Sequence, residues 1–106
     1  MSWCVEYTYE AQDDLASLDN SQRIQVLKSI KKVSGNPLPA AEGGYGKPLG
    51  NRQSSHLAGY LKIKLKKLGI RIVYGLVRKN NVMRVIVISV RSDDTVYKIA
   101  QDRIRK

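Results

Sequence analysis

The sequence predicts an α+β fold with the element order β-α-α-β-β-β-α. Two observations carry this prediction. Apolar residues recur at the helical period over 21–35, and three segments rich in β-branched residues follow one another over 60–90 with short turns between them. Strands joined by short turns pair antiparallel, so we expect a mostly antiparallel sheet packed by two N-terminal helices. The length of 106 residues fits one domain over 1–106.

The N-terminal third is expected to form one strand and two helices. Residues 2–8 alternate between apolar and polar side chains, which predicts a strand. Thr8 or a neighbour then caps a helix over 9–18, which carries acidic residues in its first turn. The second helix covers 21–35 and ends at Gly35. Its predicted buried stripe consists of Ile24, Leu27, Ile30 and Val33.

The stretch 36–58 has the composition of a loop and contains all three prolines. So long a loop is uncommon in a compact domain. We therefore expect either a functional role for it or a short turn of helix within "PAAEGG" and "KPLG".

The C-terminal half is expected to supply the rest of the sheet and a last helix. The predicted strands cover 60–66, 70–78 and 82–90, with turns at "KKLG" and "KNN". "SDDT" at 92–95 then begins a short amphipathic helix. Its inward side chains are predicted to be Val96, Ile99, Ala100 and Ile104.

Charge is the strongest feature of the composition. Nineteen Lys and Arg residues against nine Asp and Glu residues give a net charge of +10. Between Glu42 and Asp93 there are eleven basic residues and no acidic one. Such one-sided charge indicates a polyanionic partner, either nucleic acid or an acidic protein, although a basic surface that only aids solubility is the alternative.

Several classes of protein are disfavoured. A single cysteine, Cys4, cannot form an internal disulfide, and its apolar surroundings predict a buried thiol. No Cys/His cluster suggests zinc, and we expect no cofactor. The N-terminus does not resemble a signal peptide, and no apolar run is long enough to cross a bilayer, so we expect a cytoplasmic protein.

The segment 59–77 places cations on a predicted strand. Residues two apart on a strand share a face, so Leu61, Ile63 and Leu65 should point to the core. Lys62, Lys64 and Lys66 should then line the opposite, open face, and the next strand should bring Arg71 close to them. Like charges on neighbouring strands destabilise a sheet. The face is therefore expected to bind nucleic acid, to dock an acidic protein or to perform phosphoryl chemistry.

The motifs of this region resemble the RelE branch of the RelE/ParE toxins of bacterial type II toxin–antitoxin systems. "YLKIKLKKLGIRIVYGLV" is similar to the Y-K-I-K-L…G-Y-R-L-V-Y pattern of that branch, and "VIVISV…VY" is similar to the segment that ends its sheet and enters its last helix. The expected order of strands and helices fits the family layout. The resemblance implies a toxin that cleaves mRNA in the ribosomal A site, with the 2′-oxygen attacking the adjacent phosphate. The sequence lacks the carboxylate cluster of a metal nuclease, so we expect no metal requirement.

The resemblance also implies roles for particular residues. Lys62 and Lys64 match the catalytic lysine pair, and Arg71 matches the arginine that stabilises the cleaved phosphate. Tyr97 matches a tyrosine that orients or activates the 2′-hydroxyl. The segment between "VISV" and "VY" is two residues shorter than in the best-known members, which leaves Arg91 as the contact to the leaving group or its general acid.

Three further cations are expected to bind substrate: Lys66, Lys67 and Arg52. The alternative interpretation of Lys62 and Lys64 is a solvated edge that opposes aggregation. Tyr97 has a structural alternative as well, because it neighbours the inward stripe of the last helix. His56, the only histidine, is expected to have no role.

Two other functions remain open at this point. One is inhibition of DNA gyrase, as in ParE-like proteins, although these generally lack the lysine pair. The other is a nuclease-dead protein that only joins its antitoxin and represses an operator. The expected partners are a RelB-like antitoxin, mRNA and the ribosome, and operator DNA through the toxin–antitoxin complex, with no membrane.

Overall fold

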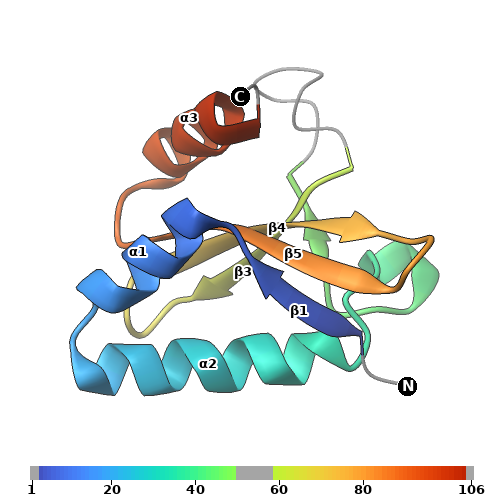
Figure 1. The fold of residues 1–106 in the computed structure, drawn as a ribbon, viewed down its shortest axis with the longest axis horizontal. Coiled ribbons are helices and arrows are strands. Elements are labelled where there is room, and N and C mark those ends of the chain that lie inside the picture. Colours follow the sequence, from blue (N-terminus) through green and yellow to red (C-terminus); the bar gives the residue numbers. More distant parts are fainter. Residues whose placement is uncertain (1–2, 50–58, 105–106) are drawn as a thin grey trace.

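The computed structural model describes residues 3–49 and 59–104 of the chain. Figure 1 shows a sheet that lies between the long helix α2 on one side and helix α3 on the other. In chain order the elements are β1 (Cys4–Tyr7), α1 (Tyr9–Ser17), α2 (Asn20–Ser34), a 3-10 turn η1 (Ala40–Glu42), β2 (Lys47–Pro48), β3 (Leu61–Leu65), β4 (Ile70–Val77), β5 (Val82–Ser89) and α3 (Asp93–Ile104).

Within the described residues, five strands form one sheet in the order β1-β5-β4-β3-β2. The pairs β2–β3, β3–β4 and β4–β5 are antiparallel, and β1 joins β5 in parallel. The predicted α+β fold with a mostly antiparallel sheet is therefore confirmed. The parallel edge follows from the topology, because α1 and α2 carry the chain away from β1 before the antiparallel strands begin.

The two N-terminal helices begin where their capping residues predict. The Thr8 side chain accepts a hydrogen bond from the Ala11 amide and caps α1. Asp19 caps α2 through a reciprocal capping box with Gln22, in which each side chain bonds the other residue's backbone amide. These contacts satisfy amide groups that have no partner inside a helix, which is why a helix begins at each position.

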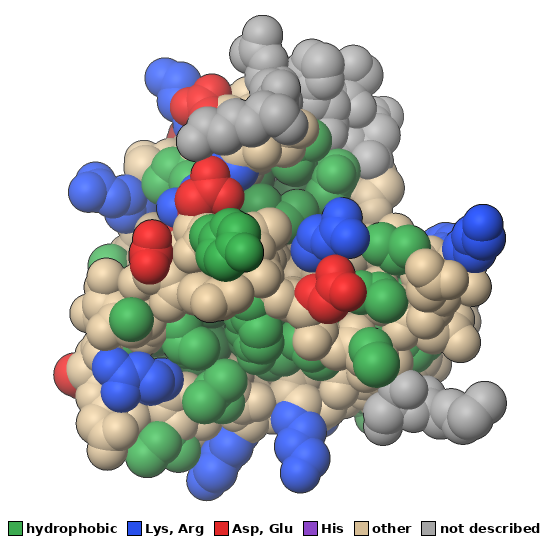
Figure 2. Space-filling view, viewed as in Figure 1, with side chains coloured by type: hydrophobic (Ala, Val, Ile, Leu, Met, Phe, Trp, Pro, Cys, Tyr) green, Lys and Arg blue, Asp and Glu red, His purple; other side chains and the backbone are tan. Residues whose placement is uncertain are grey.

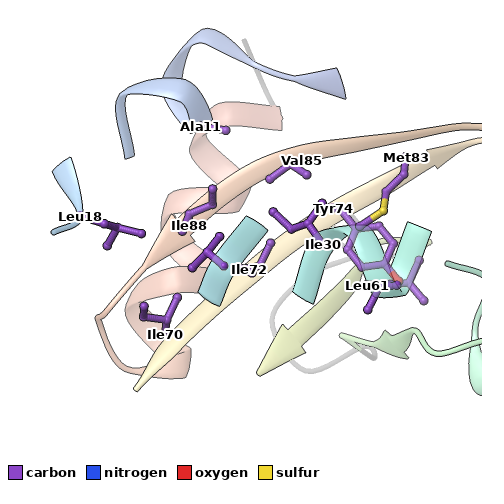
Figure 3. Close-up of a cluster of buried hydrophobic side chains, with 12 residues drawn as sticks. Ala11, Leu18, Ile30, Leu61, Ile70, Ile72, Tyr74, Met83, Val85 and Ile88 are labelled. Carbon is purple, nitrogen blue, oxygen red and sulfur yellow. The ribbon is translucent and has the colours of Figure 1, made fainter. Parts of the chain in front are cut away.

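The larger core lies between the sheet and the helices α1 and α2. Figure 3 shows Ile72 and Tyr74 of β4 meeting Ile30 of α2, with Leu61 of β3 beside them. The predicted stripe of α2 is wrong in part, because Ile24 and Leu27 are 44% and 40% exposed. The buried stripe is Val26, Ile30 and Val33, whose spacing of four and three residues also fits one helical face.

The opposite face of the sheet is not open, contrary to the prediction. Helix α3 packs on it through Val96, Tyr97 and Ala100, and together with Val73 they form part of a second, smaller core. The pairing of β4 with β5 shifts register between Val73 and Tyr74, so β5 holds an extra residue there. This bulge allows Ile86 and Val87, adjacent in sequence, both to join the second core.

Part of the loop before β3 is ordered by backbone pairing. Residues 40–42 form the short helical turn, and Lys47–Pro48 form a strand that pairs with β3. A Cβ atom on Gly46 would lie 2.5 Å from the Leu61 side chain and 2.6 Å from the Tyr74 hydroxyl, so only glycine fits there. This segment therefore crosses the edge of the larger core before it becomes β2.

Two further expectations have outcomes in the described part of the chain. Cys4 is exposed on the edge strand β1, so the predicted burial of its thiol is wrong. None of the helices that the structure describes is long and apolar enough to cross a membrane.

Candidate active site

Strand β3 carries two lysines on the face that helix α3 covers. Leu61 is buried in the larger core, and Ile63 and Leu65 pack against that core, as their alternation predicts. Lys62 and Lys64 therefore point to the other face, where both are half-buried. Their stems lie along a folded surface, which leaves them less freedom than lysines in open solvent.

Lys62 and Tyr97 are joined although 35 residues separate them in the sequence. The Lys62 Nζ donates a hydrogen bond of 2.9 Å to the Tyr97 hydroxyl. It also lies 5.6 Å from the centre of the tyrosine ring, within the range of a cation–π contact. Because Tyr97 is only 2% exposed and its ring belongs to the second core, the packing of α3 fixes where its hydroxyl lies.

Lys64 and Arg71 lie directly opposite each other on β3 and β4. Side chains at opposed positions share a face. Lys62 and Lys64 of β3 and Arg71 of β4 therefore form one cationic row across the two strands. The Arg71 guanidinium also donates a hydrogen bond of 2.9 Å to the carbonyl oxygen of Arg91. This contact ties β4 to the segment that leads from β5 into α3, and it places the backbone of the exposed Arg91 beside the row.

The structure thus brings together all five residues predicted to be catalytic: Lys62, Lys64, Arg71, Arg91 and Tyr97. The predicted substrate-binding residues Lys66 and Lys67 are exposed in the turn after β3, outside the strand. They line an open groove of about 660 Å³ with Lys64 and the α2 residues Ser21 and Gln25. Arg52 and His56 lie outside the described residues.

One cation next to these residues was not predicted from the sequence. Lys47 of β2 lies directly opposite Lys62. The signal was the motif "KPLG", but two residues are too few for alternation to reveal a strand. The pairing of β2 with β3 shows that Lys47 belongs to the row.

Three acidic side chains, Asp14, Glu42 and Glu6, pair with arginines outside this row. Asp14 accepts a hydrogen bond of 2.7 Å from Arg103, and this carboxylate raises the pKa of the arginine. Glu42 binds Arg78 at 2.8 Å, and the hydrogen bonds from that guanidinium hold the pKa of Glu42 below its ordinary value. Glu6 binds Arg84 at 3.3 Å. Figure 2 shows one face of the molecule, on which acidic side chains gather around α1 and β1.

The pair of Arg103 and Asp14 also fixes α3. Arg103 also donates a hydrogen bond of 2.8 Å to the carbonyl oxygen of Ile86 at the bulge, while Asp14 accepts one from the Ile88 amide. Because both side chains are less than one-fifth exposed, this ion pair is screened less than a surface pair. It holds the C-terminal end of α3 against α1 and β5, which keeps Tyr97 over Lys62.

The site combines the hydrogen-bond donors of lysine and arginine side chains with a phenol. In residues 3–49 and 59–104, no three His, Cys, Asp or Glu side chains come together in a way that could hold a metal ion. The ammonium group of Lys64 and the guanidinium group of Arg71, at opposed positions on β3 and β4, can both bind the oxygens of a phosphodiester. A hydroxyl and an amine in contact can also relay a proton.

Comparisons with known proteins find relatives of one kind. No family model matches the sequence. A protein of Escherichia coli provisionally described as a RelE-like toxin protein is 26% identical over 106 residues, which cover 99% of this chain and 100% of that protein.

Solved structures show the same fold. A free E. coli RelE toxin with two arginines changed to alanine is 26% identical with a TM-score of 0.73, covering 98% of this chain and 99% of that one. The same variant bound to a peptide of the antitoxin RelB is 25% identical with a TM-score of 0.66, covering 94% and 95%. Along its whole sequence and in its fold, this chain is therefore similar to RelE toxins.

Proposed function

We propose that this protein is the toxin of a type II toxin–antitoxin system and acts as a ribosome-dependent endoribonuclease that cuts mRNA in the A site. The observation that carries the proposal is the contact between Lys62 on β3 and Tyr97 on α3, beside Lys64 and Arg71. A solvated edge that only opposes aggregation does not require a buried tyrosine hydroxyl to bond one of its lysines.

The proposed reaction is an internal transfer within the RNA. The 2′-oxygen attacks the adjacent phosphorus, and the bond from phosphorus to the 5′-oxygen of the next nucleotide breaks. The products are a 2′,3′-cyclic phosphate and a free 5′-hydroxyl. The 2′-hydroxyl must lose a proton and the leaving oxygen must gain one, so the site needs both a base and a donor.

Each member of the site has a proposed role. Tyr97 and Lys62 receive the 2′-hydroxyl, with the tyrosine oxygen as its orienting partner and a lysine amine as the proton acceptor. Lys64 and Arg71 stabilise the negative charge that develops on the phosphate oxygens. Arg91 contacts the leaving oxygen, since its backbone is held by Arg71. A guanidinium does not release a proton, so the leaving oxygen takes its proton from water. Fixed cations would take the place that a metal ion has in other nucleases, so the proposed reaction is metal-independent.

Substrate binding is proposed to extend beyond the reacting phosphate. Lys66 and Lys67 are exposed beside Lys64 and would attract the backbone of mRNA or of the ribosome through charge. Arg52 stays a prediction for a further phosphate contact. Action on ribosomes would place the protein in the cytoplasm.

The proposed protein partner is a RelB-like antitoxin. A RelE relative of the same fold was solved with a peptide of its antitoxin RelB. The net charge of +10 favours an acidic or amphipathic antitoxin that covers the cationic row or displaces α3. We further propose that the toxin–antitoxin complex binds operator DNA.

The test is cleavage in a bacterial translation extract, mapped by primer extension on a reporter mRNA. The native chain should cut within codons only when ribosomes translate, and the Lys62→Ala/Lys64→Ala variant should cut at least about 100-fold less, as expected when acid–base groups are lost. The matched control is Lys28→Ala/Lys31→Ala, which removes the same charge from exposed positions on α2 and should cut like the native chain. Added antitoxin should stop the native activity.

Other outcomes would redirect the proposal. Undiminished cutting by the Lys62→Ala/Lys64→Ala variant would refute the assigned site. A native chain that leaves mRNA intact but impairs supercoiling by DNA gyrase would act as ParE-like proteins do. A chain that does neither, yet binds its antitoxin, would be a nuclease-dead corepressor.

A further inference from the structure

Strand β2 adds to the site a cation, Lys47, that was not among the predicted site residues. Lys47 pairs with Lys62 across β2 and β3, and it is exposed. Pairing alone indicates that the two side chains share a face, because opposed residues on neighbouring strands point the same way.

The neighbours of Lys47 confirm the direction of its side chain independently. A Cβ atom on Gly46 would point at Leu61 and Tyr74 in the larger core. On the other side, Leu49 is buried in the second core beneath α3. Because direction alternates along an extended chain, Lys47 points away from the Gly46 side and toward the Leu49 side, which is the face of Lys62 and Tyr97.

No acid in the described part of the chain pairs with Lys47, whereas Arg78, Arg84 and Arg103 each bind a carboxylate. Like charges at directly opposed positions are destabilising. The pair of Lys47 and Lys62 therefore favours an anion between or above the two ammonium groups.

The cations form a bent row across three strands. It runs from Arg71 to the opposed Lys64, along β3 to Lys62, and across to the opposed Lys47. Opposed residues lie about 5 Å apart and alternate residues on a strand about 7 Å apart. Such a row is longer than one phosphate requires, and it suits consecutive phosphates of one RNA strand.

We propose that Lys47 binds the phosphate next to the one that is cleaved, on the side of the row away from Arg71. This inference rests on the proposed ribonuclease function. Lys47 would be a positioning residue, because the Lys62–Tyr97 contact, and not Lys47, holds the reacting group. Its contribution should appear in binding and in the dependence on salt, and not in the rate of the chemical step.

The experiment compares Lys47→Ala with Lys79→Ala, which removes the same charge from the exposed turn between β4 and β5. In single-turnover cleavage on programmed ribosomes, Lys47→Ala should raise the half-saturating protein concentration about 3- to 10-fold and change the maximal rate less than about 2-fold. Lys47→Arg should restore the native value, and Lys79→Ala should match the native chain. Equal behaviour of Lys47→Ala and Lys79→Ala would overturn the inference.

A second measurement separates this inference from the proposed function. A short single-stranded RNA with a 2′-deoxy nucleotide at the cut position cannot react, and its binding is followed by fluorescence anisotropy over a range of salt concentrations. Loss of one phosphate contact should reduce the slope of log affinity against log salt by about 0.7 in Lys47→Ala only. This slope decides whether Lys47 binds phosphate even if the native chain proves not to cut mRNA, and an unchanged slope would refute the site.

Discussion

The two faces of the sheet hold different kinds of interior. On strand β4, the neighbours Ile72 and Val73 are both fully buried, yet Ile72 joins the larger core under α1 and α2 while Val73 joins the smaller core under α3. The β3 side chains that face the larger core, Leu61, Ile63 and Leu65, are all apolar. The smaller core ends at the half-buried lysines of β3.

A small protein can keep such a cationic row because its two faces contribute differently to stability. Apolar packing on one face supplies stability, which leaves part of the other face for charged groups that reduce it. The smaller core has a second use, because it fixes α3 and so positions Tyr97 over Lys62. The face under α1 and α2 mainly contributes to stability. The face under α3 carries both the smaller core and the candidate active site.

Two buried tyrosines show the same contrast. Tyr74 donates a hydrogen bond of 2.8 Å to the carbonyl oxygen of Pro37, and so ties the loop to the larger core. Tyr97 instead accepts a hydrogen bond from Lys62 at the edge of the smaller core. Burial is nearly equal for the two, at 0% and 2% exposed, so their partners and not their exposure separate their roles.

The largest expected effect is on stability, from Ile72→Ala. Truncation of this fully buried side chain should cost about 2–5 kcal/mol of the free energy of unfolding, measured by urea denaturation. Val73→Ala on the other face removes fewer methyl groups and should cost less, yet it should lower cleavage beyond what the unfolded fraction explains, since it loosens α3. Equal losses of cleavage per folded molecule in the two variants would contradict the division between the faces.

Tyr97→Phe should have the next largest effect, and mainly on activity. The variant keeps the ring in the smaller core but loses the hydroxyl that Lys62 contacts, so cleavage should fall about 100-fold. Tyr74→Phe is the matched control, because it removes a buried hydroxyl from the other face and should leave cleavage per folded molecule unchanged. The comparison is made in the translation extract, with thermal unfolding as the check on folding. Full activity in Tyr97→Phe would show that its hydroxyl is structural.

The smallest effect is confined to alkaline solution and concerns Tyr74. Burial raises the pKa of Tyr74 above its ordinary value of 10.0. Above about pH 10 the unfolded chain releases this proton while the folded protein keeps it, so stability falls by up to about 1.4 kcal/mol per pH unit. Below pH 10 both states hold the proton, and this contribution is constant.

The Tyr74→Phe variant should lack this part of the alkaline loss, although it starts lower by about 1–3 kcal/mol because Pro37 loses its partner. Urea denaturation of both proteins at pH 8, 10 and 11 measures the difference. Tyr7, whose pKa is also raised by burial, is present in both and cancels. Parallel pH profiles would contradict the assignment to Tyr74.

Much of the fold could be read from local patterns. The capping residues Thr8 and Asp19 mark where the helices begin, and the alternation of β3 predicts which side chains enter the larger core. The stripe of α2 was predicted only in part, because Ile24 and Val26 are both apolar and the sequence does not show how the helix is rotated against the sheet. The bulge in β5 was not predictable either, since it depends on pairing with β4.

Some features of the candidate site could likewise be predicted from the sequence, and others could not. Local patterns in the sequence predict the α+β fold, the lysines on one face of a strand, and a stretch without acids between Glu42 and Asp93, because alternation, propensity and charge are local properties. Tertiary packing shows that α3 covers that face, that Tyr97 meets Lys62, and that Lys47 joins the row. These contacts join segments that are far apart in the chain. The segments are brought together by the packing of α3 and the pairing of β2, and no local pattern encodes either.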